Sequence, residues 1–151
     1  MKKQQSVVGP TMGVVSDLSF QSQNYLNSLP MVPTPGEDRL KEGVEVLKQL
    51  KDFPTKNEEE AALVAIQQGK ILNALKKGFS NEYLWGKWAY YNLHFLTESR
   101  QKKIMLLADR TYLHKFAKLG IQLLLDTIKI VGNADAEVIE RFIRGTYFNL
   151  I

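Results

Sequence analysis

The chain of 151 residues has the length of one ordinary domain, contains no cysteine and has two histidines. Without cysteine it has no thiol nucleophile, disulfide framework or cysteine zinc site, and two histidines are too few for a histidine-rich one. Its 20 basic and 16 acidic residues give a net charge of +4. This charge permits anionic partners but lies far below that of a dedicated nucleic-acid-binding arm.

No stretch of the sequence reaches the roughly 18 apolar residues of a membrane span. The first residues, MKKQQSVVGP, begin with basic side chains, but glycine, serine and aspartate interrupt the stretch that follows. We therefore expect neither a secretion signal nor a membrane span. The expected location is intracellular and soluble, either in the cytoplasm or in a virion.

The N-terminal quarter of the chain differs in composition from the rest. Residues 1–36 contain three charged side chains and four of the five prolines. Because proline disfavours helices and central strands, we predict an extended N-terminal arm over residues 1–35. A short helix at 16–29, capped by Ser16, is predicted within it. The remaining residues, 36–151, are predicted to form a helical bundle domain.

The arm is poor in charge but rich in apolar side chains, which distinguishes it from most disordered segments. A segment of this composition is suited to burial against a partner. We predict that the arm docks on neighbouring subunits through the following side chains: Val7, Val8, Val14, Val15, Leu18, Phe20, Tyr25, Leu26 and Leu29.

Two well-marked helices are predicted at the start of the bundle domain. The first lies within residues 35–53, where acidic side chains stand in the first turn, lysines stand late and Pro54 ends the pattern. The second lies within residues 57–78. It begins with Asn57 as a cap, continues through three glutamates, and ends at Gly78.

Helical patterns continue to the end of the chain. A segment at 81–96 follows a Ser80 cap, a segment at 99–131 is broken near Asp109 or Gly120, and a last one covers 135–148. Strand alternation is absent. We therefore predict an all-α fold, a compact bundle of four to six helices preceded by the extended, proline-punctuated arm.

The segment 81–96 holds six of the fifteen aromatic side chains, including both tryptophans. On a helix these side chains point in nearly every direction, which favours a buried helix at the centre of the bundle, with Trp88 in its core. The alternatives are a platform that stacks bases or sugars, and a mixed case in which one face contacts another subunit. The candidate interface aromatics are Trp85, Trp88 and Tyr91, with Trp85 nearer the edge of the apolar arc.

The segment 100–118 carries the largest local excess of basic side chains. Phosphate binding needs such cations on one surface, so the segment is a candidate nucleic-acid contact. On one helix, however, these cations scatter over more than half of the circumference. That pattern favours a solvated edge of the bundle. The candidate cations are Arg100, Lys102, Lys103, Arg110, Lys115 and Lys118.

No pattern in the sequence predicts catalysis. Glu58, Glu59 and Glu60 stand at a helix start, where they interact favourably with the helix dipole and point in different directions. The glycines form no phosphate-binding loop, and His94 is more typical of a structural histidine than of a catalyst. We therefore predict a chain that is not an enzyme, with no catalytic residues, no metal site and no cofactor.

Two classes of function remain. The first is a structural subunit of a large multi-protein assembly, by analogy with virion connectors, head-completion proteins and internal virion proteins. Its partners would be other protein subunits, in a homo-oligomer or a hetero-assembly. The second is a helical nucleic-acid-binding accessory protein that uses the segment 100–118.

Overall fold

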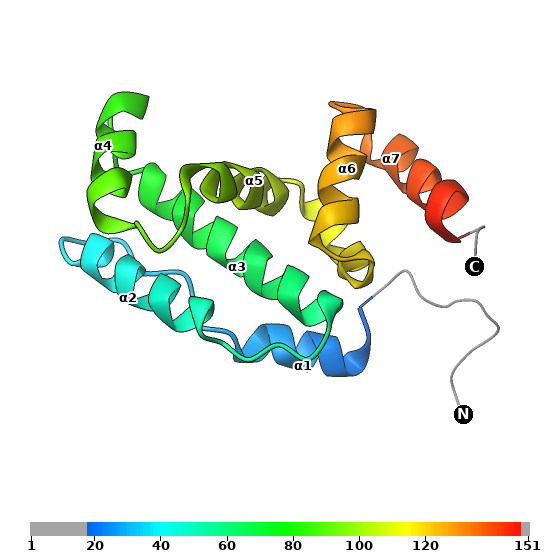
Figure 1. The fold of residues 1–151 in the computed structure, drawn as a ribbon, viewed down its shortest axis with the longest axis horizontal. Helices are drawn as coiled ribbons and strands as arrows, with labels where there is room; N and C mark the ends of the chain where they lie inside the picture. The colour runs from blue at the N-terminus through cyan, green and yellow to red at the C-terminus, as the bar shows by residue number, and fades with distance from the viewer. Residues whose placement is uncertain (1–17, 149–151) are drawn as a thin grey trace.

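The computed structural model describes residues 18–148, and every regular element within that range is a helix (Figure 1). The prediction of an all-α fold is confirmed for this part of the chain. The elements in chain order are α1 (Phe20–Ser28), α2 (Arg39–Lys51), α3 (Glu58–Lys76), α4 (Glu82–Asn92), α5 (Glu98–Asp109), the 3-10 helix η1 (Thr111–Leu119), α6 (Ile121–Val131), α7 (Ala136–Ile143) and the π-helical turn η2 (Arg144–Phe148).

The structure contains more helical segments than the four to six predicted. The predicted segment 99–131 divides twice, at Arg110 and at Gly120, so that α5, η1 and α6 replace one broken helix. Gly120 has a φ of 88°, a conformation that favours glycine, and its geometry fixes the second break. None of the helices within residues 18–148 has the length and apolar character needed to cross a bilayer.

Side-chain caps begin four of these helices, α1, α3, α4 and α5. Asn57 caps α3 as predicted, because its Oδ1 accepts a hydrogen bond of 2.9 Å from the Glu60 amide. At α4 the cap is Asn81 instead of Ser80. At α1 the cap is Ser19, whereas the predicted Ser16 lies outside the described residues. In each case the capping residue has an extended backbone directly before the first helical residue, which places its side-chain oxygen over the free amides.

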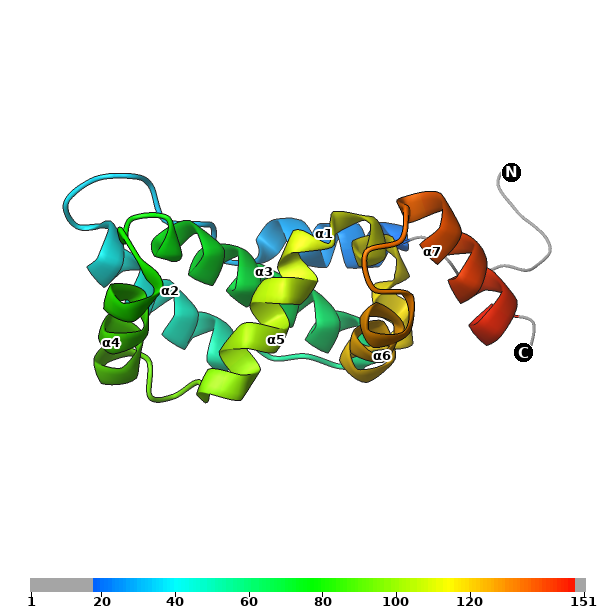
Figure 2. The same cartoon turned by 90° about the horizontal axis from the view of Figure 1, so that it is seen from above.

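The central helix is α3, which packs against α1, α2, α5, α6 and η1 (Figure 1). The prediction that the aromatic segment 81–96 forms the central helix is wrong. That segment forms the short helix α4, which ends at Asn92 and lies at one end of the elongated molecule, far from α7 (Figures 1 and 2). Its tyrosines Tyr83, Tyr90 and Tyr91 are exposed, and the hydroxyl group of each ring can remain in contact with water.

Small side chains allow α3 to be surrounded by other helices. The closest approach is at Gly69, where an ideal Cβ would stand 2.0 Å from the Ile104 carbonyl oxygen in α5. Only glycine permits this distance between the two helices. Gly69 therefore permits the close crossing of α3 and α5.

The described part of the predicted arm packs on the chain's own helices. Leu29 is 4% exposed within the first core cluster, and Leu18 and Leu26 pack against that cluster. Tyr25 stacks on Phe53 with ring centroids 5.5 Å apart and donates a hydrogen bond of 2.7 Å to the Pro54 carbonyl. Part of the apolar surface of this stretch is thus buried within the same chain.

The remaining arm residues differ in their surroundings. Phe20, on α1, is largely exposed. Val7, Val8, Val14 and Val15 lie outside the described residues. Docking of the arm on neighbouring subunits stays a prediction.

Candidate functional site

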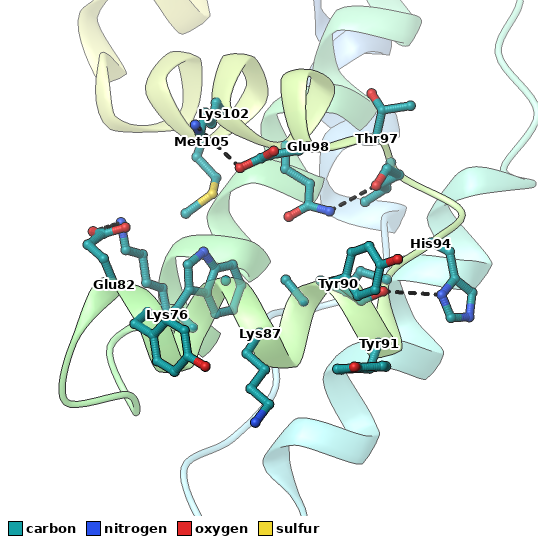
Figure 3. A pocket seen from close by; sticks show the side chains of 17 residues that line it. Lys76, Glu82, Lys87, Tyr90, Tyr91, His94, Thr97, Glu98, Lys102 and Met105 are labelled. Atoms are coloured by element: carbon teal, nitrogen blue, oxygen red, sulfur yellow. Dashed lines mark hydrogen bonds and ion pairs between the residues drawn. The ribbon is translucent and has the colours of Figure 1, made fainter.

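A groove of about 1030 Å³ lies between α4 and α5 (Figure 3). Its apolar lining comes from both helices and from the loop that joins them. Met105 points from α5 toward α4, and Tyr90 stands on the α4 wall (Figure 3). The other apolar lining residues are Trp85, Ala89, Leu93 and Leu96, all of them buried.

The loop between the two helices is tightly held. Leu93 is the C-terminal cap of α4, and its amide donates a hydrogen bond of 2.8 Å to the Ala89 carbonyl. Thr97 then caps α5 by accepting a hydrogen bond from the Arg100 amide. The buried Gln101 side chain donates to the Leu96 carbonyl at 2.8 Å. These contacts hold the loop that joins the two walls of the groove.

Gly86 leaves the middle of the α4 wall without a side chain. At about 100° per residue, positions 82, 86, 89 and 93 share one face of a helix, so Gly86 stands in line with the lining residue Ala89. No atom lies within 4 Å of an ideal Cβ at Gly86. A glycine inside a helix costs roughly 0.5–1 kcal/mol relative to alanine, and no packing within the described residues requires one here. The position is therefore open space on the groove surface.

The aromatic side chains divide into a buried cluster and an exposed group. Trp85 is 6% exposed, stacks on Trp88 at 5.8 Å, and both indoles lie 5.6 Å from the Phe79 ring. Tyr83 and Tyr90 are 72% and 75% exposed. Tyr91 is exposed as well and meets Tyr90 edge-on.

The predicted ranking of the two tryptophans is reversed in the structure. Trp85 belongs to the core cluster, whereas Trp88 is only partly buried and packs against it. The predicted apolar arc assumed one helix over 81–96, but Phe95 and Leu96 follow the end of α4 and do not extend its apolar face. A subunit contact by Trp85, Trp88 or Tyr91 stays a prediction. Phe79, which supports both indoles, was missed because it precedes the aromatic segment.

Ion pairs neutralise most of the charge along the groove. Lys76 and Glu82 are 2.5 Å apart at one end, and Lys102 and Glu98 are 3.5 Å apart on α5 (Figure 3). Lys87 lies on the side of α4 that faces away from α5 (Figure 3). The space between the helices is therefore apolar, with neutralised charges at its rim.

The candidate nucleic-acid cations do not act as one group. Besides Lys102, which pairs with Glu98, Arg110 donates to the Gly132 carbonyl at 2.8 Å and fastens the turn after α6. Lys115 pairs with Glu140 at 2.5 Å. Arg100 is half-buried, and desolvation lowers its pKa. Lys103 and Lys118 are exposed. Three of the six cations thus hold contacts within the chain, and nucleic-acid binding stays a prediction.

Two titratable groups lie outside the groove. The His114 Nε2 is 2.9 Å from the Leu107 carbonyl oxygen, and burial lowers the pKa of this histidine. Hydrogen bonding from Lys115 lowers the pKa of Glu140, which also accepts from Arg144. The Glu140–Arg144 spacing of four is readable from the sequence, but the Lys115 partner comes from a distant element. Within residues 18–148 no three potential metal-ligating His, Asp or Glu side chains cluster.

Comparison of the chain with known protein families, with curated proteins and with solved structures finds no match. An open apolar groove with exposed tyrosines on one wall and ion pairs at its rim is suited to binding a polypeptide.

Proposed function

We propose that the chain is a non-enzymatic assembly subunit that binds protein through the groove between α4 and α5. The observation that carries this proposal is the exposure of Tyr83 and Tyr90 beside an apolar groove. Tyrosine and tryptophan are favoured at protein interfaces, because their large rings bury apolar area with little loss of conformational freedom. Burying these rings in a complex would remove apolar area from water.

A protein ligand fits this groove better than a base or a sugar. Tyr90 and Tyr91 meet at an interplanar angle of 87°, so they offer no pair of parallel faces between which a flat ring would stack. The groove volume of about 1030 Å³ lies at the upper limit of small-molecule pockets, which span roughly 300–1,000 Å³. An open groove of this size is suited to a segment of polypeptide.

The proposal is tested by removing the exposed rings and isolating the native assembly. Tyr83→Ser combined with Tyr90→Ser should prevent incorporation of the chain into its assembly, measured by mass spectrometry of the isolated particle. Because both rings are exposed, helicity and melting temperature should change little.

The matched control is Ile130→Ser, which removes an exposed apolar side chain from α6 and should assemble normally. Normal incorporation of the double tyrosine variant would contradict the proposal. Loss of incorporation in the Ile130 variant alone would instead place the interface on α6.

A further inference from the structure

We propose that the occupant of the groove between α4 and α5 is the segment 6–16 of a second copy of this chain. This inference rests on the proposed function, since it names the polypeptide that the groove binds. Three properties support it: the chemistry of the segment, the shape of the groove, and the distance between the groove and the start of α1.

The segment and the groove match in charge. Residues 6–16, SVVGPTMGVVS, contain no charged side chain and five apolar ones. The groove rim carries Lys76 paired with Glu82 and Lys102 paired with Glu98. An uncharged segment leaves these pairs undisturbed and introduces no charge into the apolar space, where an unpaired charge would be costly.

The groove is shaped to accept a backbone at close range. Gly86 and Ala89 leave the α4 wall flat, and no atom lies within 4 Å of an ideal Cβ at Gly86. Pro10 disfavours a helix and favours an extended backbone at the residue before it, so we expect the segment to bind in an extended conformation. An extended backbone needs polar partners along its length, and the exposed Tyr90 beside the groove supplies a hydroxyl group that both donates and accepts.

The second half of the segment cannot reach the groove of its own chain. The Ser22 hydroxyl donates to Glu59 at 2.7 Å, so α1 starts near the beginning of α3, whereas Lys76 at the end of α3 borders the groove. At 1.5 Å per residue, Glu59 and Lys76 are about 25 Å apart along α3. Val14 precedes Leu18 by four positions and reaches at most about 14 Å from it.

A second copy is therefore required if Val14 and Val15 occupy a groove. Two views show α4 at one end of the molecule and the start of α1 well away from it, beyond the middle of the molecule (Figures 1 and 2). Each copy would present its groove at the α4 end and contribute the segment that precedes its α1. Such a head-to-tail contact joins different surfaces, so it generates a closed ring or an open filament.

Disulfide crosslinking tests this contact directly, because the full chain contains no cysteine. Two single variants, Val14→Cys and Gly86→Cys, are prepared, mixed and oxidised. A Cβ at Gly86 meets no atom within 4 Å. We expect a crosslinked dimer in which mass spectrometry finds the two new thiols joined between different chains. Excess cysteine-free chain should reduce its yield in proportion to its concentration.

A matched control places the second cysteine elsewhere. Ile130→Cys on α6 is exposed and lies on a helix that does not line the groove, and mixed with Val14→Cys it should crosslink at least tenfold less than Gly86→Cys does. Equal yields for the two positions would overturn the inference, as would no crosslink at Gly86. A disulfide formed only within one chain, in the double variant Val14→Cys/Gly86→Cys, would also overturn it.

The two experiments distinguish whether segment 6–16 fails to bind the groove or whether the groove binds no polypeptide at all. If the Tyr83 and Tyr90 substitutions prevent assembly but Val14→Cys does not crosslink to Gly86→Cys, the groove binds another polypeptide and only the inference about the segment is wrong. If those tyrosine substitutions leave assembly intact, the groove is not the binding site.

Discussion

The crossing of α3 and α5 makes Gly69→Ala the sharpest test of the fold that supports the groove. A Cβ at Gly69 would stand 2.0 Å from the Ile104 carbonyl oxygen, 2.6 Å from its carbonyl carbon and 2.8 Å from the Ala108 Cβ. Two of these atoms belong to the backbone of a helix and cannot rotate away. To reach even 3.0 Å, the two helices would have to separate by about 1 Å at a buried site.

The change in the free energy of unfolding caused by Gly69→Ala is the difference between two opposing effects. Overpacking a buried contact typically costs about 1–3 kcal/mol, and a clash with helix backbone belongs at the upper end. Alanine returns about 1 kcal/mol through its higher helix propensity. We therefore expect the free energy of unfolding to fall by about 2 kcal/mol. For a chain of this size the melting temperature should fall by about 4–8 °C.

Thermal and urea unfolding followed by circular dichroism measure this effect, and Gly86→Ala is the matched control. Gly86 is also a glycine inside a helix, but its Cβ would meet no atom within 4 Å. The control should therefore gain about 0.5–1 kcal/mol of stability. If Gly69→Ala were as stable as Gly86→Ala, the close approach of α3 and α5 would be refuted.

Three further predictions concern contacts away from the groove. Leu29→Ala should destabilise the chain by about 2–5 kcal/mol in urea unfolding, because Leu29 is buried in the core; an unchanged midpoint would show that it is not. Gly78→Ala should displace the Arg39 guanidinium, which donates to the Ala74 carbonyl at 3.0 Å, and should cost about 1–2 kcal/mol. In the double variant Gly78→Ala/Arg39→Ala, the loss of stability should be close to that of Arg39→Ala alone. Additive losses from the two substitutions would contradict the hydrogen bond between Arg39 and the Ala74 carbonyl. Finally, burial lowers the pKa of His114 below 6.5, so its contribution to stability should be complete above that pH and decrease as the pH falls toward the lowered value. His114→Gln should flatten the melting temperature between about pH 7 and 5, and an unaltered profile would exclude this histidine as the cause.

Local signals in the sequence were sufficient to predict several helices. The Asn57 cap and the glutamates that follow it define the start of α3, and Asp109 and Gly120 mark the two breaks on either side of η1. These features depend on neighbouring residues alone. The groove could be predicted only in part, since the aromatic segment was recognised as a candidate interface but was placed at the centre of the bundle.

The wrong predictions concern features that depend on contacts between segments distant in the sequence. The hydrophobicity of 81–96 does not show that α4 ends at Asn92 or that α3 occupies the centre. The approach of Ile104 to Gly69 depends on the packing of two helices and has no local signal. The pairing of Lys115 with Glu140 joins residues 25 positions apart, so a basic segment that resembled a binding surface contributes to internal contacts.

Hydrogen exchange on the intact native assembly shows whether the groove between α4 and α5 is the interface, because it maps protected amides without a mutation. Amides of α4 and of the first turn of α5 should exchange more slowly in the assembly than in the isolated chain, while those of exposed α2 residues should be unchanged. Equal exchange of α4 in the two states, with slower exchange elsewhere on the surface, would contradict binding through this groove.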